Sequence, residues 1–128
     1  MTTVWTNGCF DILHRGHIEM LQYAKSCGDI LIVGVDTDEK VRTNKGPERP
    51  VTRLEDRIFI LQSLSCVDEV VSFDSKEALE KTIETVAPDV LVVGSDWRGR
   101  EVVGSHYAKE VSFFERIPGY STTKILEK

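Results

Sequence analysis

The sequence predicts a single α/β domain over residues 1–128, with helices on both faces of a doubly wound, mainly parallel sheet of five strands. Three observations predict this fold class. Short β-prone runs alternate with helical patterns, the connections between them are short, and residues 30–35 and 90–94 are almost uninterrupted apolar runs, as in strands covered on both sides. A chain of 128 residues is long enough to bury one core and too short for two.

The first half of the chain begins as strand, loop and helix. Residues 4–6 are β-prone and run into Asn7-Gly8, and residues 17–26 place Ile18, Leu21 and Ala24 on one helical face. The residues Cys27-Gly28-Asp29 end this helix, and the second strand follows over residues 30–35. Residues 37–51 are polar and rich in Gly and Pro, which predicts a mobile basic loop with the cations Lys40, Arg42, Lys45 and Arg49.

The second half repeats the alternation. Periodic apolar residues predict helices over 54–64 and 76–86, the latter ended by Pro88, and β-prone runs predict strands over 69–73, 90–94 and 111–114, with a short helix near 105–109. No internal repeat or low-complexity segment interrupts the pattern. In such sheets the carboxyl ends of the strands form the ligand-binding edge.

Composition restricts the function classes. A net charge of -5 argues against a general nucleic-acid or anionic-membrane binder, which needs an excess of Lys and Arg. Three cysteines without paired spacing indicate neither a disulfide framework nor a Cys-based zinc site. The chain shows no leader pattern and no apolar run near the length of a membrane span, so we expect a cytoplasmic protein.

The loop after the first strand carries the most distinctive chemistry. His14 and His17 flank Arg15-Gly16, so two imidazoles can face one pocket, and Gly16 lets a ligand approach the backbone. The helix that follows presents unpaired N–H groups and a positive dipole end, which suit a phosphate. The alternatives are capping or core histidines, and an i, i+3 zinc pair that lacks an obvious third ligand because His106 lies in an unremarkable segment.

Two stretches, in order, resemble the signatures of one enzyme family. Residues 7–17, NGCFDILHRGH, resemble the (G)xFDxxHxGH motif of the cytidylyltransferase-like nucleotidylyltransferases, and residues 116–125, RIPGYSTTKI, resemble their RxxGxSTTKI motif. The resemblance runs essentially end to end and implies a Rossmann-like fold of the HIGH type. The second motif also makes physical sense, since Ser121 and Thr122 are N-cap types before a helix expected over residues 123–128.

The resemblance implies a role for each matching residue. It implies catalytic roles for His14, His17, Lys45 and Arg116, and substrate binding by Asp11, Lys45 and Arg57. It implies nucleotide binding by Asn7, Gly8, Cys9, Phe10, Gly16, Gly94, Asp96, Trp97, Gly119, Ser121, Thr122 and Thr123. Purely structural roles are the alternatives for four of these residues. Lys45 would then lie in a solvated loop, Cys9 and Trp97 would be packing residues, and Arg57 would form a helix-surface ion pair with Glu55 or Asp56.

The implied reaction is an in-line attack of an acceptor phosphate on the α-phosphorus of a nucleoside triphosphate, with Mg²⁺ and release of pyrophosphate. Trp97 and the residues 119–124 are similar to glycerol-3-phosphate cytidylyltransferases, which favours CTP slightly. Residues 6–14, 45–51 and 103–105 are similar to heptose-1-phosphate adenylyltransferase domains, so ATP with a heptose 1-phosphate is the alternative. The family also implies a homodimer. An idle nucleotide-binding scaffold is a rival, and a redox dinucleotide domain lacks its G-x-G-x-x-G motif.

Overall fold

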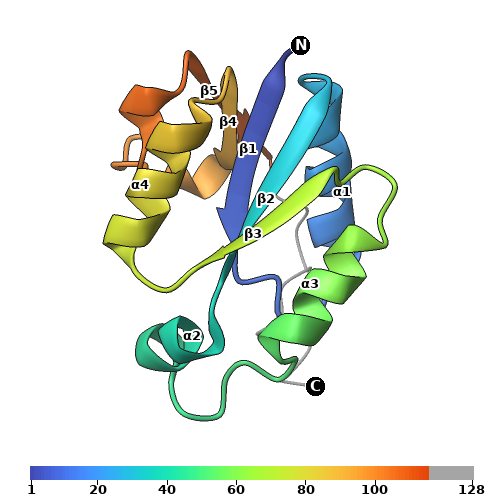
Figure 1. The fold of residues 1–128 in the computed structure, drawn as a ribbon, viewed down its shortest axis with the longest axis vertical. Helices are drawn as coiled ribbons and strands as arrows, with labels where there is room; N and C mark the ends of the chain where they lie inside the picture. Colours follow the sequence, from blue (N-terminus) through green and yellow to red (C-terminus); the bar gives the residue numbers. More distant parts are fainter. Residues whose placement is uncertain (116–128) are drawn as a thin grey trace.

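The computed structural model describes residues 1–115, which form an α/β unit around one sheet (Figure 1). Its strands are β1 (Thr3–Gly8), β2 (Ile30–Asp36), β3 (Glu69–Phe73), β4 (Val90–Gly94) and β5 (Glu110–Phe114). Its α-helices are α1 (Arg15–Ser26), α2 (Asp38–Lys45), α3 (Leu54–Gln62) and α4 (Lys76–Val86), with 3₁₀ turns η1 (Ser95–Trp97) and η2 (Ser105–Tyr107). No helix in this part of the chain has the length and apolar character needed to cross a bilayer.

The sheet has the strand order β3-β2-β1-β4-β5, and all of its pairs are parallel. The predicted doubly wound, five-stranded sheet is therefore confirmed. The chain leaves β1 toward β2 on one side and reaches β4 on the other, so the strand order reverses between β1 and β4. In open α/β sheets the crevice for ligands lies beyond the carboxyl ends of the strands at such a reversal.

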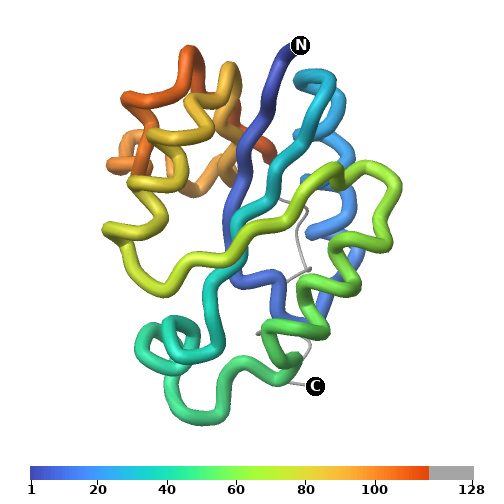
Figure 2. Tube along the Cα trace, viewed as in Figure 1, coloured from blue at the N-terminus to red at the C-terminus, as the bar shows by residue number. Residues whose placement is uncertain are grey.

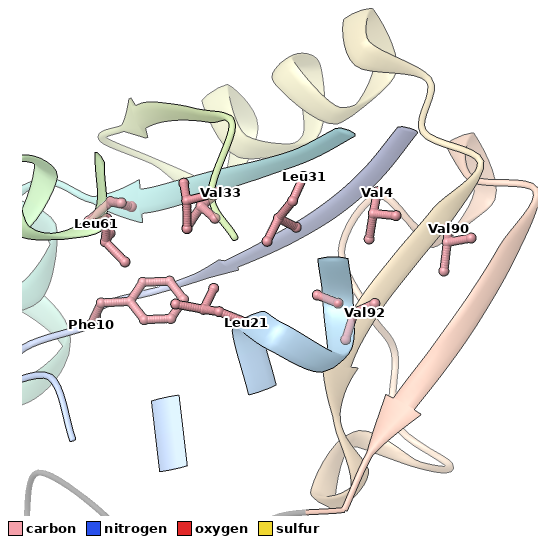
Figure 3. Close-up of a cluster of buried hydrophobic side chains, with 11 residues drawn as sticks. Val4, Phe10, Leu21, Leu31, Val33, Leu61, Val90 and Val92 are labelled. Carbon is pink, nitrogen blue, oxygen red and sulfur yellow. The ribbon is translucent and has the colours of Figure 1, made fainter. Parts of the chain in front are cut away.

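Helices cover both faces of the sheet, with α1 and α3 on one side and α4 on the other (Figure 1). One apolar cluster joins Leu21 of α1 and Leu61 of α3 to the sheet residues Val4, Leu31, Val33, Val90 and Val92, and Phe10 lies among them (Figure 3). The second cluster joins Leu79 and Ile83 of α4 to Trp5, Ile32, Phe73 and Leu91. Neighbours along a strand fall into opposite clusters, as the period-2 geometry of a strand requires.

Aspartates anchor the amino-terminal edge of the sheet. Asp29 accepts from the Thr2 amide at 2.8 Å, Asp68 from the Leu31 amide at 2.8 Å and Asp89 from the Thr3 amide at 2.8 Å. Lys25 and the Leu31 amide lower the pKa of Asp68. These carboxylates bind the protein's own backbone, which assigns this edge to stability and leaves the carboxyl edge for ligands.

The predicted mobile loop over residues 37–51 is wrong in its first half, which is the helix α2. Figure 2 shows the chain leaving β2, winding through α2 beyond the carboxyl end of the sheet and returning to α3. Thr37 caps α2 by accepting from the Lys40 amide at 3.4 Å, acidic residues occupy the first turn, and Arg42 and Lys45 occupy the last. This order of charges stabilises the helix through its dipole. The helix was not predicted, because the many cations of the segment are also typical of a solvated loop.

Several element boundaries also differ from the prediction. Helix α1 begins at Arg15, two residues before the predicted start, because the side chain of His14 serves as its N-cap. The helix expected near 105–109 is only the 3₁₀ turn η2, entered through Gly104 at φ 80°. The turn η1 was not predicted. The helix expected over residues 123–128 lies outside the described residues.

Candidate active site

A pocket of about 610 Å³ opens at the carboxyl ends of β1 and β4, where the strand order reverses. Ten residues expected from the sequence line it: Asn7, Gly8, Cys9, Phe10, Asp11, His14, His17, Lys45, Gly94 and Trp97. The structure thus gathers the loop after β1, the last residue of α2 and the loop after β4 around one cavity, as the carboxyl-edge rule predicts.

The two histidines lie face to face at the start of α1. Their ring centroids are 3.8 Å apart with an interplanar angle of 23°. His14 Nδ1 accepts from the Gly16 amide at 3.1 Å, and His17 Nδ1 accepts from the His14 amide at 3.2 Å, a reciprocal capping box. Because each Nδ1 accepts a hydrogen bond, each ring carries its proton on Nε2. The capping role, one of the alternatives for these histidines, is therefore confirmed, and both rings also line the pocket.

Phe10 fixes the loop that carries these rings. The side chain is buried in the α1–α3 cluster (Figure 3), and its ring meets that of His17 edge-on with the centroids 5.5 Å apart. Phe10 and Ile12 both have φ 52°, a left-handed backbone conformation that residues other than Gly rarely adopt. The strained turn lets the chain place Asp11 on one side and the histidines on the other.

Asp11 is buried and takes donors from the segment between α2 and α3. Its carboxylate accepts from Arg49 Nε at 3.2 Å, the Val51 amide at 2.9 Å and the Thr52 amide at 2.9 Å. Burial by itself raises the pKa of Asp11, but the Thr52 and Val51 amides and the Arg49 guanidinium outweigh it, and the pKa is lowered. Asp11 lines the pocket as expected, and it also clamps two loops together.

Arg57 does not lie on the helix surface, where one of its two sequence interpretations placed it. It is fully buried, so the helix-surface ion pair with Glu55 or Asp56 is wrong. Its guanidinium donates to the Cys9 carbonyl at 2.8 Å, the Asp36 carbonyl at 2.8 Å, the Thr52 carbonyl at 3.0 Å and Asp38 Oδ1 at 2.7 Å. Arg57 does not line the pocket, so any part it has in substrate binding runs through the loops that it holds.

Four cationic side chains of the described residues line the pocket. Lys40 and Lys45 come from α2, Arg49 from the segment after it and Lys76 from the first position of α4. Lys40 is held 3.3 Å from Asp36 Oδ1 and 5.4 Å from the centroid of Phe73. The chain is acidic overall, so this group is a local concentration of positive charge suited to a polyanion.

The β4 side supplies an aromatic wall. Trp97 is 38% exposed, lines the pocket and has the Arg100 guanidinium 5.4 Å from its ring centroid. Asp96 and Gly16 do not line the cavity, although each adjoins a residue near it. Burial raises the pKa of the Cys9 thiol, so this pocket cysteine is protonated rather than a nucleophile.

Part of the expected site lies outside the described residues: Arg116, Gly119, Ser121, Thr122 and Thr123. The structure adds lining residues to which the sequence analysis assigned no site role: Thr6, Met20, Asp36, Lys40, Asn44, Arg49, Lys76, Leu79, Val93, Val102 and Val103. A usable signal existed for Lys76, because it opens the helix after β3 and so lies at the carboxyl edge. Within residues 1–115 no three His, Cys, Asp or Glu side chains are grouped as ligands for a metal ion.

Comparison with known proteins places the chain in a family. The family model described as cytidylyltransferase-like matches residues 5–128. The chain is 51% identical over 125 residues to the bifunctional protein HldE of Helicobacter pylori strain P12, and 51% identical over 125 residues to that of Wolinella succinogenes. Each alignment covers 98% of this chain but only 27% and 26% of those proteins, so the chain spans about a quarter of their length.

Solved structures agree with this placement. The lipopolysaccharide core biosynthesis protein from Thermoplasma volcanium superposes with a TM-score of 0.71 and 28% identity, over 91% of this chain and 99% of that one. A protein of unknown function from Archaeoglobus fulgidus, 22% identical with a TM-score of 0.59, shares the fold over 77% of this chain and 73% of its own. With a family model that matches nearly the whole sequence, this chain belongs to the cytidylyltransferase-like family of nucleotidyltransferases.

Proposed function

We propose that this chain transfers the adenylyl group of ATP to a heptose 1-phosphate, forming ADP-heptose and pyrophosphate. The observation that carries the nucleotidyl transfer is the pocket itself. Two stacked imidazoles at the start of α1 share about 610 Å³ with four cationic side chains, at the point of the sheet where ligands bind. Two phosphorylated substrates need such a concentration of donors and positive charge.

The chemistry requires no protein nucleophile. An oxygen of the acceptor phosphate forms a bond to the α-phosphorus of the nucleotide, and the bond from that phosphorus to the bridging oxygen of the β-phosphate breaks, so that its electron pair leaves with pyrophosphate. The acceptor phosphate is already ionised at neutral pH. The chain's residues then have two tasks, which are to align two anions and to stabilise the charge that grows on the transferred group.

His14 and His17 present Nε2–H donors fixed by their capping bonds, and Lys45 and Arg49 add charge beside them. The start of α1 adds a positive dipole end. Arg116 and the hydroxyl-rich residues 121–123 are proposed, from the family resemblance, to complete the nucleotide site.

The donor set of the pocket fits Mg²⁺ carried by the nucleotide. Mg²⁺ keeps several waters and is usually held by one or two carboxylates and the substrate's own phosphates. Two carboxylates from the described part of the chain line the pocket. Asp11 is buried and accepts from Arg49 and from the Val51 and Thr52 amides, whereas Asp36 is more exposed and pairs with Lys40 at 3.3 Å. Asp36 is thus the residue we propose to hold the ion, which would neutralise charge on the leaving pyrophosphate.

The identity of base and acceptor rests on relatives. The slight preference for CTP came from Trp97 and residues 119–124. The 51% identity to bifunctional HldE proteins, over almost the whole chain, favours the adenylyltransferase alternative instead. The likeness to a lipopolysaccharide core biosynthesis protein supports an acceptor sugar rather than a polyol. The intact histidine pair supports an active enzyme over an idle scaffold. We further propose, from family resemblance alone, a cytoplasmic homodimer.

A pyrophosphate-release panel tests the proposal. The panel crosses ATP, CTP, GTP and UTP with heptose 1-phosphate, other sugar 1-phosphates and glycerol 3-phosphate, each with Mg²⁺. We expect ATP with heptose 1-phosphate to exceed all other pairs in kcat/KM. A maximum at CTP with glycerol 3-phosphate would overturn the assignment of substrates, and no turnover with any pair would overturn the enzymatic function. Size-exclusion chromatography with light scattering checks the dimer.

A further inference from the structure

Trp5, in the middle of β1, is the largest of the fully buried side chains in the described part of the chain. Its indole carries a polar N–H into the core. Nε1 donates to Oδ1 of Asn7 at 2.9 Å. An indole nitrogen only donates, so the carboxamide must turn its oxygen toward the ring. The NH₂ group of Asn7, which has two donors, is thereby directed away from Trp5.

The protein is built around this contact. A Cβ at Gly34 would lie 2.5 Å from Cζ2 and 2.8 Å from Cη2 of Trp5, so Gly34 makes room for the ring. Glycine inside a buried strand gives up packing and backbone order. The ring is also enclosed by the cluster that contains Phe73, Leu79 and Ile83. Trp5 therefore cannot turn, and the direction of its N–H is fixed.

The contact places Asn7 on a particular side of the pocket. Asn7 ends β1 and lines the cavity, and its partner Trp5 belongs to the cluster under α4. Lys76 and Leu79 of α4 line the same side. His14 and His17 reach the cavity from α1, which covers the opposite face of the sheet (Figure 1). The carboxamide and the imidazoles thus approach the pocket from the two faces.

We propose that Trp5 is a positioning residue which holds Asn7 so that its NH₂ group donates to an oxygen of the phosphorylated acceptor. This inference rests on the proposed nucleotidyl transfer. If the donors at the start of α1 take the triphosphate, the α4 side is left for the second substrate, and it offers the amide of Asn7 and the ammonium of Lys76. The sequence resemblance implied that Asn7 binds the nucleotide. Because Asn7 lies on the α4 side of the sheet, we assign it to the acceptor instead.

Two substitutions at Asn7 test the donor. Asn7→Asp keeps an oxygen for the Trp5 N–H and replaces the NH₂ group with an anionic oxygen, which repels a phosphate. Asn7→Ala removes both. We expect kcat/KM for the acceptor to fall about tenfold or more in each, as for loss of a hydrogen bond to a charged group, while the Kd of the nucleotide stays the same. Gln62→Glu, on the exposed end of α3, makes the same change of charge outside the pocket and should alter neither value.

A double-mutant cycle tests the positioning by Trp5. Trp5→Phe keeps an aromatic ring and removes the donor, so the carboxamide is free to rotate and the KM of the acceptor should rise several-fold. In the Asn7→Ala background, Trp5→Phe should cause no further rise, because its effect acts through Asn7. Additive effects would show that Trp5 matters only for packing, and would overturn the inference. Circular dichroism confirms that each variant is folded.

A measurement on the unaltered protein guards against a Trp5→Phe chain that does not fold. The ¹⁵N–¹H resonance of the Trp5 indole should shift when acceptor is added and stay in place when nucleotide is added. A shift of this resonance with nucleotide alone would show that Asn7 contacts the nucleotide and not the acceptor, and would overturn the inference. If the wild-type chain turns over a substrate pair but the cycle is additive, only the inference fails. If it turns over no pair, the proposed function fails and this role fails with it.

Discussion

At the scale of single residues, His14 and His17 combine two duties that usually fall to different side chains. Each accepts a backbone N–H at the start of α1, and each lines the pocket. The sequence motif located both rings, because their spacing around Gly16 is recognisable in the chain itself. It did not separate capping from ligand binding, since the two need the same position.

Replacing His14 or His17 with Ala should lower turnover about 100-fold or more in each case, the usual effect of losing one transition-state donor. His14→Ala should also cost about 1 kcal/mol of unfolding free energy through the lost N-cap. Pyrophosphate release and urea unfolding measure the two effects. His106→Ala is the matched control, because that ring is 62% exposed and lies outside the pocket. Turnover equal to wild type in the pocket variants would remove the histidines from the proposed mechanism.

Asp11 gives a pH dependence whose sign is fixed by its lowered pKa. Its folded-state pKa lies below the ordinary value of 3.8, so the ionised carboxylate stabilises the fold at neutral pH. This contribution is complete above the unfolded-state pKa and is lost as the pH falls through the folded-state pKa. Asp11→Asn should therefore lower the unfolding free energy at pH 7, and the gap to wild type should shrink as the pH falls below about 4.

Urea titrations across this pH range measure the effect of Asp11→Asn. Asp74→Asn, at an exposed position after β3, is the control. A gap between Asp11→Asn and wild type that stayed constant with pH would contradict the role of the ionised carboxylate. The partners of Asp11 were beyond the sequence analysis, because Arg49, Val51 and Thr52 lie 38 to 41 residues away and the contact depends on the tertiary fold.

At the scale of elements, the strands and the long helices were predictable because each has a periodic apolar pattern. The helix α2 was not predictable in this way, since only Val41 of its eight residues is buried and its many cations are typical of a polar loop. Its N-cap Thr37 and its acidic first turn were the usable signals. The error matters for the site, because α2 brings Lys40, Asn44 and Lys45 to the pocket on a regular scaffold.

Arg57 joins three of these elements, and Arg57→Lys should expose its importance. A single ammonium cannot reach the Cys9, Asp36 and Thr52 carbonyls and Asp38 together, as the planar guanidinium does. We expect a loss of about 3 kcal/mol in unfolding free energy. Arg53→Lys, at the exposed N-cap of the same helix, should change stability little. Equal losses in the two variants would show that the buried contacts carry no special weight.

At the scale of the whole molecule, the order β3-β2-β1-β4-β5 decides where the chemistry lies. The fold class and the ligand-binding edge followed from the sequence, because parallel strands bring all of their carboxyl ends to one edge. The full lining of the pocket did not follow, since the sequence analysis assigned no site role to Leu79, which lies on a predicted helix, or to Val102. The strand order emerges only when the strands are assembled.

The contrast between a net charge of -5 and a cationic pocket predicts a salt effect. Raising NaCl from about 0.1 M to about 1 M shortens the Debye length from about 10 Å to about 3 Å, so the Kd of the nucleotide or acceptor should rise several-fold. Lys76→Gln should reduce this dependence. Lys109→Gln should not, because Lys109 pairs with Asp89 at 3.0 Å at the opposite edge of the sheet. Titration calorimetry at both salt concentrations makes the comparison, and equal slopes would contradict local attraction.

The capping bonds of the histidine pair restrict what kind of catalysis these rings can perform. An imidazole that took up a second proton would lose the Nδ1 lone pair that receives the backbone hydrogen, and its capping bond at the start of α1 would break. Acid–base cycling at these rings would therefore break and remake a capping bond in every turnover. The architecture instead suits them to hold a growing negative charge by hydrogen bonds alone, with no proton changing hands.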